Sequence, residues 1–205
     1  MSKKPQKHHY ETSKEANLNS FAASLVIFTL IMFYFINIRG QPFDLAFSNR
    51  AFAIGAVFLI GLSYFLGPLA GISKSIARKL QYRKPLGLYG YSFATIHILL
   101  SFLVVPADVL GANGLSLFFG MIAIIIFSFV AMSSMMNEES INAFGFERWQ
   151  RIQRMGYLAF FLVILHFVIL ENGQFIGRQV GQLTLVFASL VILARIITVF
   201  SKKRR

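Results

Sequence analysis

Six long apolar runs constrain this chain more than any other feature. A helix that crosses the hydrocarbon core of a membrane needs about 20 mostly apolar residues. The chain has six runs that can hold such a helix, and the fifth is expected to extend past Glu171, while the sixth contains one charge, Arg195. They cover residues 16–38, 51–73, 85–106, 109–137, 155–170 and 179–201. The sequence therefore predicts an all-α bundle of six transmembrane helices.

The overall composition also indicates a membrane protein rather than a soluble domain. Hydrophobic residues make up 56% of the chain and charged residues 14%, which is too apolar for an ordinary soluble protein. The formal net charge of +12 would suggest nucleic-acid binding in a soluble chain. Here the cations lie at the ends of apolar runs, where they orient helices. We expect contacts with membrane lipid and none with nucleic acid.

The distribution of Lys and Arg predicts the orientation of the bundle. With six spans, four basic groups fall on one side, and the opposite loops contain only Arg39, Arg50 and Arg178. The asymmetry of sixteen against three predicts that both termini are cytoplasmic. The sixteen are Lys3, Lys4, Lys7, Lys14, Lys74, Arg78, Lys79, Arg83, Lys84, Arg148, Arg151, Arg154, Lys202, Lys203, Arg204 and Arg205. We expect a polar tail at 1–16, a membrane domain at 17–201 and a basic end at 202–205.

Two of the four histidines lie inside the apolar runs, where an ionisable group is costly and needs a partner. His97 follows Lys84 by 13 residues and His166 follows Arg154 by 12. At 1.5 Å per residue both are ~18 to 20 Å from the cytoplasmic edge, at or a little beyond mid-membrane. The third and fifth helices run in the same direction, so the two imidazoles are expected to face each other. His8 and His9 lie in the polar tail, where we expect them to be solvated.

Two imidazoles at one level match the axial ligands of a haem b. The chain has no Cys, which excludes thiolate-held iron–sulfur clusters, Cys-ligated zinc and covalently attached c-type haem. A zinc site is disfavoured because no third protein ligand lies at that depth. The alternative is that each His only hydrogen-bonds across the bundle, or relays protons, in a membrane transporter or scaffold without haem.

Small and basic residues accompany the two histidines. Gly87, Gly90, Ala94 and Ser101 share one face of the third helix with His97, and Ala159 precedes His166 by seven residues. This stripe either leaves room for a flat macrocycle or allows close helix packing. Arg195 is predicted to bind a haem propionate or a flavin phosphate, unless it extends to the interface. Arg83, Arg151 and Arg154 reach the same side and are candidates for a phosphorylated cofactor such as FMN, although topology alone would place them there.

Two stretches carry a family resemblance: residues 83–88, which lead to His97, and residues 149–158, which lead to His166. Both are similar to the ferric reductase-like transmembrane superfamily. Within it, the likeness is greatest to the haem-binding membrane subunits of the bacterial envelope methionine sulfoxide reductase system, the MsrQ family. The resemblance covers residues from about 20 to about 200. It implies that His97 and His166 bind haem b.

The resemblance also implies a function in the bacterial inner membrane. Electrons would pass from a cytoplasmic reduced flavin, supplied by a flavin reductase, or from quinol, through membrane haem to a periplasmic acceptor. In the family this acceptor is a molybdenum-cofactor enzyme that repairs methionine sulfoxide. The family has a further His where this chain has Gln153, and since glutamine is a poor haem ligand we expect one haem. A ferric reductase acting directly on external iron remains an alternative.

Overall fold

The computed structural model describes residues 13–71, 73–104, 113–170 and 175–203. Within these ranges it contains helices and no strand, and six helices are long and apolar enough to cross a membrane. The prediction of an all-α bundle with six transmembrane helices is therefore confirmed. His8 and His9, Glu171, and the last two residues of the basic end lie outside the described residues.

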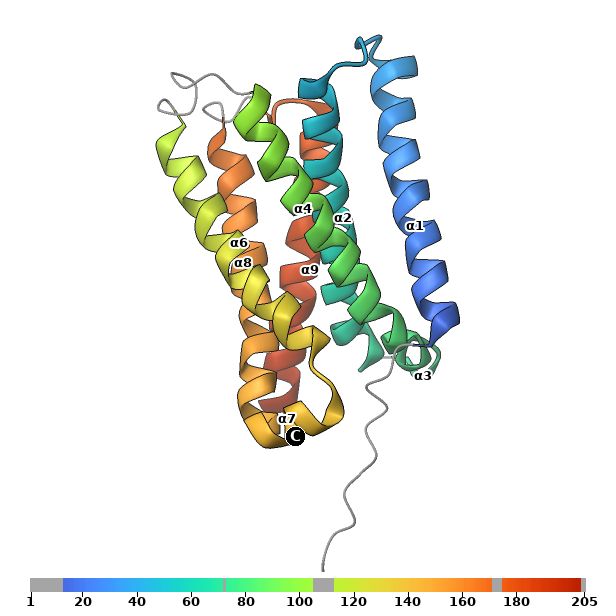
Figure 1. The fold of residues 1–205 in the computed structure, drawn as a ribbon, viewed down its shortest axis with the longest axis vertical. Coiled ribbons are helices and arrows are strands. Elements are labelled where there is room, and N and C mark those ends of the chain that lie inside the picture. Colours follow the sequence, from blue (N-terminus) through green and yellow to red (C-terminus); the bar gives the residue numbers. More distant parts are fainter. Residues whose placement is uncertain (1–12, 72, 105–112, 171–174, 204–205) are drawn as a thin grey trace, which may run out of the picture.

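The long helices stand side by side and are joined at their ends by short elements (Figure 1). The described chain begins and ends at the same end of the bundle, which we call the terminal end; the other is the distal end (Figure 1). The long helices are α1 (Lys14–Phe33, continued by a π-helical turn Tyr34–Ile38), α2 (Leu45–Ala70), α4 (Arg83–Val104), α6 (Gly114–Met135), α8 (Phe146–Ile169) and α9 (Gln179–Lys203). The short ones are α3 (Lys74–Ala77), a 3₁₀ turn (Arg78–Tyr82) and α7 (Glu138–Phe144).

Side-chain caps set where several helices begin. The Ser13 hydroxyl accepts a hydrogen bond from the Ala16 amide at 3.0 Å, so α1 starts within the predicted polar tail. The Asp44 carboxylate accepts from the Phe47 amide at 2.6 Å, and α2 therefore starts before residue 51, the predicted start of the second span. Such caps satisfy amide groups that have no partner within the helix.

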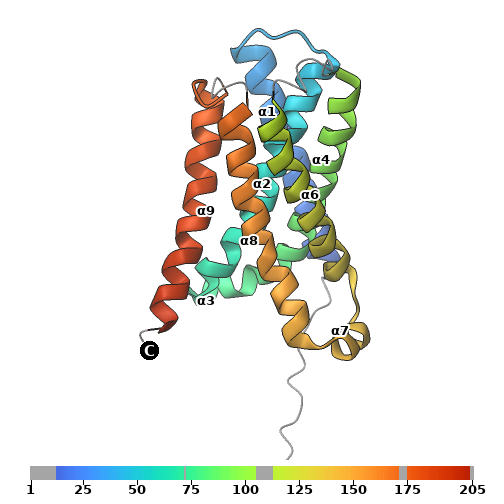
Figure 2. The ribbon, with the colours of Figure 1, turned by 90° about the vertical axis from the view of Figure 1, so that its left-hand side faces the viewer.

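The bundle is built around α2, which is the most buried of the six spanning helices. It packs on α4 along most of its length and also contacts α1 and α9, while α6 and α8 pack on each other. One core cluster joins α2, α6, α8 and α9 around Tyr64, Phe127 and Phe160, and a second joins α1 and α2 around Phe35 and Phe47. Figure 2 shows α8 between α6 and α9.

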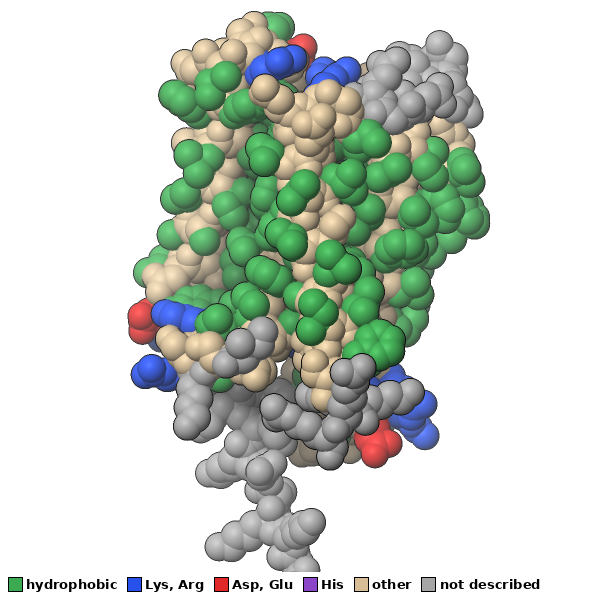
Figure 3. Space-filling model, turned by 180° about the vertical axis from the view of Figure 1, so that it is seen from behind, with side chains coloured by type: hydrophobic (Ala, Val, Ile, Leu, Met, Phe, Trp, Pro, Cys, Tyr) green, Lys and Arg blue, Asp and Glu red, His purple; other side chains and the backbone are tan. Residues whose placement is uncertain are grey.

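The outer surface of the bundle is apolar between two charged ends. Hydrophobic side chains cover its middle, and Lys, Arg, Asp and Glu gather at the ends (Figure 3). Leu103 is 75% exposed, and Phe43 and Met135 are 70% exposed. A soluble monomer rarely exposes apolar surface on this scale. Hydroxyl groups within the spans, such as those of Ser20, Ser24 and Thr184, donate to the carbonyl one turn earlier, as an apolar surrounding requires.

Candidate functional site

His97 is held on α4 by a polar side chain of α2. Its Nδ1 lies 2.6 Å from Oδ1 of Asn49 and 3.3 Å from the Asn49 carbonyl oxygen. The amide nitrogen of Asn49 donates to the Ser101 hydroxyl at 3.1 Å, which leaves Oδ1 as the acceptor. Nδ1 of His97 therefore carries the proton, and the lone pair is on Nε2.

His166 is held on α8 in the same way by the start of α6. Its Nδ1 donates to the Ser116 carbonyl oxygen at 2.8 Å, and the Ser116 hydroxyl donates to the His166 carbonyl oxygen at 2.8 Å. Gly120 lies one turn further along α6, where a Cβ would come within 3.0 Å of the imidazole Nδ1. The absence of a side chain at Gly120 thus allows α6 to approach the ring. Here too the lone pair is on Nε2.

Both Nε2 atoms remain available for a ligand. Within the described part of the chain, no hydrogen bond reaches Nε2 of His97 or His166. In that part of the chain, every polar side-chain atom that is shut off from solvent has a hydrogen-bond partner. Since neither Nε2 has such a partner, each Nε2 must border open space. Both side chains are accordingly half-buried rather than buried. This is the arrangement of a metal-ligating histidine, whose second ring nitrogen donates to a carbonyl that fixes its orientation.

The two rings belong to parallel helices at one end of the bundle. α4 and α8 both run from the terminal end to the distal end (Figures 1 and 2). Their partners Asn49 and Ser116 lie near the distal beginnings of α2 and α6, so both rings lie in the distal half of the bundle. Among the described residues α4 and α8 do not pack along each other, because α4 packs chiefly on α2 and α8 on α6.

The small-residue stripe of α4 serves helix packing. A Cβ on Gly90 would come within 2.7 Å of Ile60 Cγ1 and 2.9 Å of the Ile60 amide nitrogen, and one on Gly87 would come within 3.0 Å of Ser63 Oγ. Both partners are on α2. Ala159 is fully buried in the core cluster of α2, α6, α8 and α9. Of the two interpretations of the stripe, the structure favours close packing at these three positions.

Arg83 and Arg195 converge on two tyrosines in the terminal half of the bundle. The Arg83 guanidinium lies 5.5 Å from the Tyr64 ring centroid, and that of Arg195 lies 4.9 Å from the Tyr157 ring centroid. The Tyr157 hydroxyl donates to the Tyr64 carbonyl oxygen at 2.9 Å. Tyr157 precedes His166 by nine residues on α8, about 13 Å along the axis. These two cations therefore lie on the terminal side of the histidine pair.

Arg151 and Arg154 lie further from the histidines and form a separate surface site. Both side chains are exposed, and with Glu147 and Gln150 they line a cavity of about 290 Å³. The Arg154 guanidinium donates to Gln150 Oε1 at 2.9 Å. The structure thus groups Arg83 with Arg195, and Arg151 with Arg154, rather than bringing all four cations together.

Gln153 binds the end of α6. Its Nε2 lies 2.8 Å from Ser133 Oγ, 2.9 Å from Ser134 Oγ and 3.3 Å from the Val130 carbonyl oxygen. Trp149 donates from Nε1 to the Ser133 carbonyl oxygen at 2.9 Å. The segment that carries the second half of the family resemblance therefore joins α8 to the terminal end of α6.

The residues present fit a haem iron. Within the described ranges, no cluster of three or more His, Cys, Asp or Glu could hold a metal ion by side chains alone. A porphyrin supplies four equatorial nitrogens, so only two axial side chains are needed. His97 and His166 would supply these two ligands, each through an Nε2 atom that receives no hydrogen bond from the residues that the structure describes.

Comparison with known proteins adds one similarity. No protein-family model matches the sequence. The chain is similar to the magnetosome protein MamZ of Magnetospirillum gryphiswaldense, with 27% identity over 149 residues, or 69% of this chain and 22% of MamZ. It therefore spans about a fifth of the length of the curated relative that it matches.

The six apolar helices show which class of protein this is. The chain is a multi-pass membrane protein.

Asn49 and Ser116 were not predicted as parts of the site. Asn49 lies just before the predicted second span, and Ser116 is one of many serines in the apolar runs. Asn49 could have been predicted as part of a site from its polar side chain beside an apolar run, because a polar side chain in a membrane needs a partner. Which histidine it would meet depends on the rotation of α2 against α4.

Proposed function

We propose that this protein is a transmembrane electron-transfer subunit that binds one haem b through His97 and His166. The observation that supports this most directly is the matched state of the two imidazoles. Each donates from Nδ1 to an oxygen of a neighbouring helix and presents an unbonded Nε2 to open space. Two packing histidines without a ligand would be expected to use both ring nitrogens in an apolar bundle.

The chain's own contribution would be to orient the two ligands and to tune the reduction potential of the iron. Asn49 and Ser116 fix the tautomer and ring orientation, and hydrogen bonds to Nδ1 raise the basicity of Nε2. Gly120 lets α6 support the His166 ring closely. When bound, a haem b supplies a one-electron carrier within the membrane. We propose that Arg83 and Arg195 bind an anionic group on the terminal side, either a propionate or the phosphate of a flavin such as FMN.

The direction of transfer follows from the family resemblance together with the charge asymmetry. We propose that electrons enter from a cytoplasmic flavin or quinol at the terminal end and leave at the distal end to a periplasmic acceptor. The exposed cavity at Arg151 and Arg154 is suited to a phosphorylated donor. A methionine sulfoxide reductase with a molybdenum cofactor is the acceptor that the resemblance favours. The proposed location is the bacterial inner membrane, with the terminal end in the cytoplasm.

Absorption spectroscopy of the purified full chain tests the proposal. The protein as isolated should be red, with a low-spin spectrum that sharpens on reduction. His97→Ala and His166→Ala should each abolish the low-spin spectrum, and His97→Met should change it, because the iron would gain a different axial ligand. The matched controls His8→Ala and His9→Ala should leave it unchanged. Circular dichroism of each variant would show whether its helices are retained.

Two results would contradict the proposal. One is a folded wild-type protein that is colourless and takes up no haem when haemin is added. The other is a low-spin spectrum that persists in both alanine variants. Either result would favour a transporter or scaffold in which the histidines have packing or proton-relay roles.

A further inference from the structure

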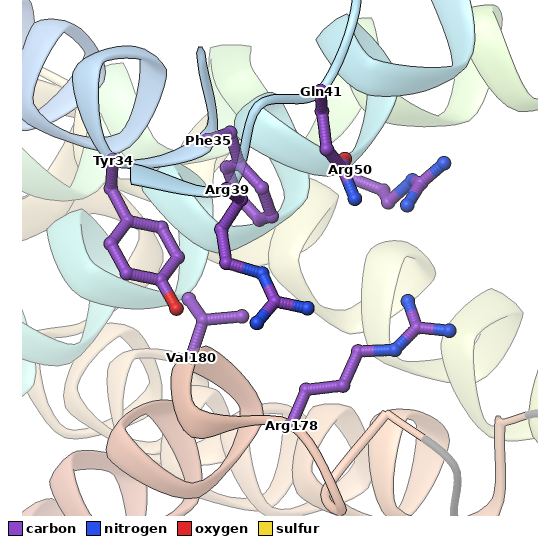
Figure 4. A pocket seen from close by; sticks show the side chains of 7 residues that line it. All are labelled: Tyr34, Phe35, Arg39, Gln41, Arg50, Arg178 and Val180. Atoms are coloured by element: carbon purple, nitrogen blue, oxygen red, sulfur yellow. The ribbon is translucent and has the colours of Figure 1, made fainter. Parts of the chain in front are cut away.

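Three arginines at the distal end lie around one cavity. Arg39 follows the π-helical turn after α1, Arg50 is on the first turns of α2, and Arg178 immediately precedes α9. They line a cavity of about 260 Å³ together with Tyr34, Phe35, Gln41 and Val180. Their guanidinium groups lie around the same space, although they come from three distant parts of the sequence (Figure 4).

Membrane topology does not account for this cluster. These three residues are the only Lys or Arg in the segments expected at the distal end. In the proposed orientation the distal end is periplasmic, where the positive-inside rule disfavours cations, and yet all three line one cavity. Arg39 and Arg50 carry like charges around the same space, where they repel, and a bound anion would lower that cost. Arg39 and Arg50 form no ion pair with any residue that the structure describes.

The donors around the cavity suit an oxyanion. Guanidinium groups present several N–H donors in a planar fork that matches phosphate and carboxylate oxygens. The side-chain amide of Gln41 adds a neutral donor, whereas the Tyr34 hydroxyl donates to Gln179 Oε1 at 3.4 Å. The volume of the cavity is several times the roughly 30 Å³ that one water occupies in the liquid. There is thus room for a tetrahedral anion with accompanying water.

The surroundings place the cavity at the boundary between apolar and polar surface. Ile38 is 64% exposed, Phe43 is 70% exposed and Leu45 is 58% exposed, and all three are close in sequence to lining residues. In a membrane, these apolar side chains would suit acyl chains, and arginines at the ends of spanning helices would lie near lipid head groups. A phosphate could therefore reach the cavity either from water or as part of an anionic lipid.

We propose that Arg39, Arg50 and Arg178 form a binding site for a phosphate-type oxyanion at the distal end of the bundle. The site is separate from the histidine pair and does not depend on the proposed haem. Its ligand is either free phosphate or the phosphodiester of an anionic lipid head group.

Thermal unfolding of the full chain provides the test. In one arm, inorganic phosphate is titrated into detergent-solubilised protein, with chloride at equal ionic strength as the reference. In the other arm, nanodiscs of phosphatidylcholine are compared with nanodiscs that also contain phosphatidylglycerol. A ligand that binds only the folded state raises the unfolding midpoint. A shift with inorganic phosphate identifies the aqueous source, and a shift with phosphatidylglycerol alone identifies the lipid.

Variants connect the shift to the cavity. Arg39→Gln and Arg50→Gln should each weaken the apparent affinity at least about tenfold, because a hydrogen bond to a charged group is lost. Arg78→Gln removes the same charge from an exposed position at the terminal end and should bind as wild type. If a glutamine variant fails to fold, Arg50→Lys keeps the charge without the planar fork and should still bind more weakly. The proposal is overturned if neither ligand shifts the wild type, or if the Arg39 and Arg50 variants respond as Arg78→Gln does.

Discussion

His97 on α4 and Asn49 on α2 are joined by a 2.6 Å hydrogen bond from the imidazole Nδ1 to the amide Oδ1. This contact links a helix that carries a proposed ligand to the most buried helix of the bundle. His166 has the equivalent relationship with Ser116 at the start of α6. The two imidazoles are therefore oriented by separate helices, His97 by a side chain that a substitution can remove and His166 by a main-chain carbonyl.

Replacing Asn49 by Leu should weaken haem binding by about tenfold or more, the usual cost of losing an outer-shell partner of a metal ligand. The His97 Nδ1 would keep only the longer contact to the Asn49 backbone carbonyl. Haem titration of the purified protein and the reduction potential would measure the effect. Ser101→Ala, which removes only a neighbour of Asn49, should have a smaller effect. Equal affinity and potential in wild type and Asn49→Leu would contradict this prediction.

Gly120→Ala should destabilise the bundle by about 1–3 kcal/mol, because the added methyl group presses on the His166 ring. The Cβ would lie 3.0 Å from Nδ1 and 3.2 Å from Cε1. Gly114→Ala on the same helix is the control, since nothing lies within 4 Å of a Cβ there. The midpoint of unfolding should fall only for Gly120→Ala. Similar midpoints for both variants would show that α6 does not support the ring closely.

Gln153→Leu should lower the free energy of unfolding by about 0.5–1.5 kcal/mol, since the amide bonds to the end of α6 are lost. Gln153 is 13 residues from His166, about 20 Å along α8, so the haem spectrum should not change. Gln150→Leu should have less effect on stability, because Gln150 accepts its hydrogen bond from the exposed Arg154. A changed low-spin spectrum in Gln153→Leu would instead indicate a redox site near this residue.

Thiol labelling would test the orientation of the bundle, because the chain has no Cys. Phe43→Cys places an exposed thiol at the distal end and Lys79→Cys places one at the terminal end. A membrane-impermeant maleimide should modify Phe43→Cys in cells with a permeable outer membrane, and Lys79→Cys only in inverted vesicles. The opposite pattern would place the termini outside the cytoplasm.

The sequence predicted the spanning helices well because length and hydropathy are local properties. It predicted the ends of these helices less well, because charged residues were taken as the limits of the spans. Arg50 marked the expected limit of the second span, whereas the Asp44 cap starts α2 at Leu45. Similarly, α8 starts at Phe146 rather than at 155, so that its first turns carry Arg151 and Arg154.

The candidate site was predicted in part. The positions of His97 and His166 on parallel helices follow from counting spans, and the structure places both rings in the distal half of the bundle. Their partners Asn49 and Ser116 depend on how α2 and α6 are rotated, which spacing along the chain does not specify. The cavity of Arg39, Arg50 and Arg178 requires three segments that are distant in the sequence to meet at one end, a tertiary property that no single segment encodes.

The separation of His97 and His166 by 69 residues along the chain has a consequence for biogenesis. The first imidazole enters the bilayer with α4, but its counterpart leaves the ribosome only after α6 and α7 have been made. Until α8 has been inserted, the nascent protein contains half of the site. If the proposed haem binds both imidazoles, its loading is a late event in assembly, and a ribosome stalled before α8 is complete would leave an integrated but colourless product.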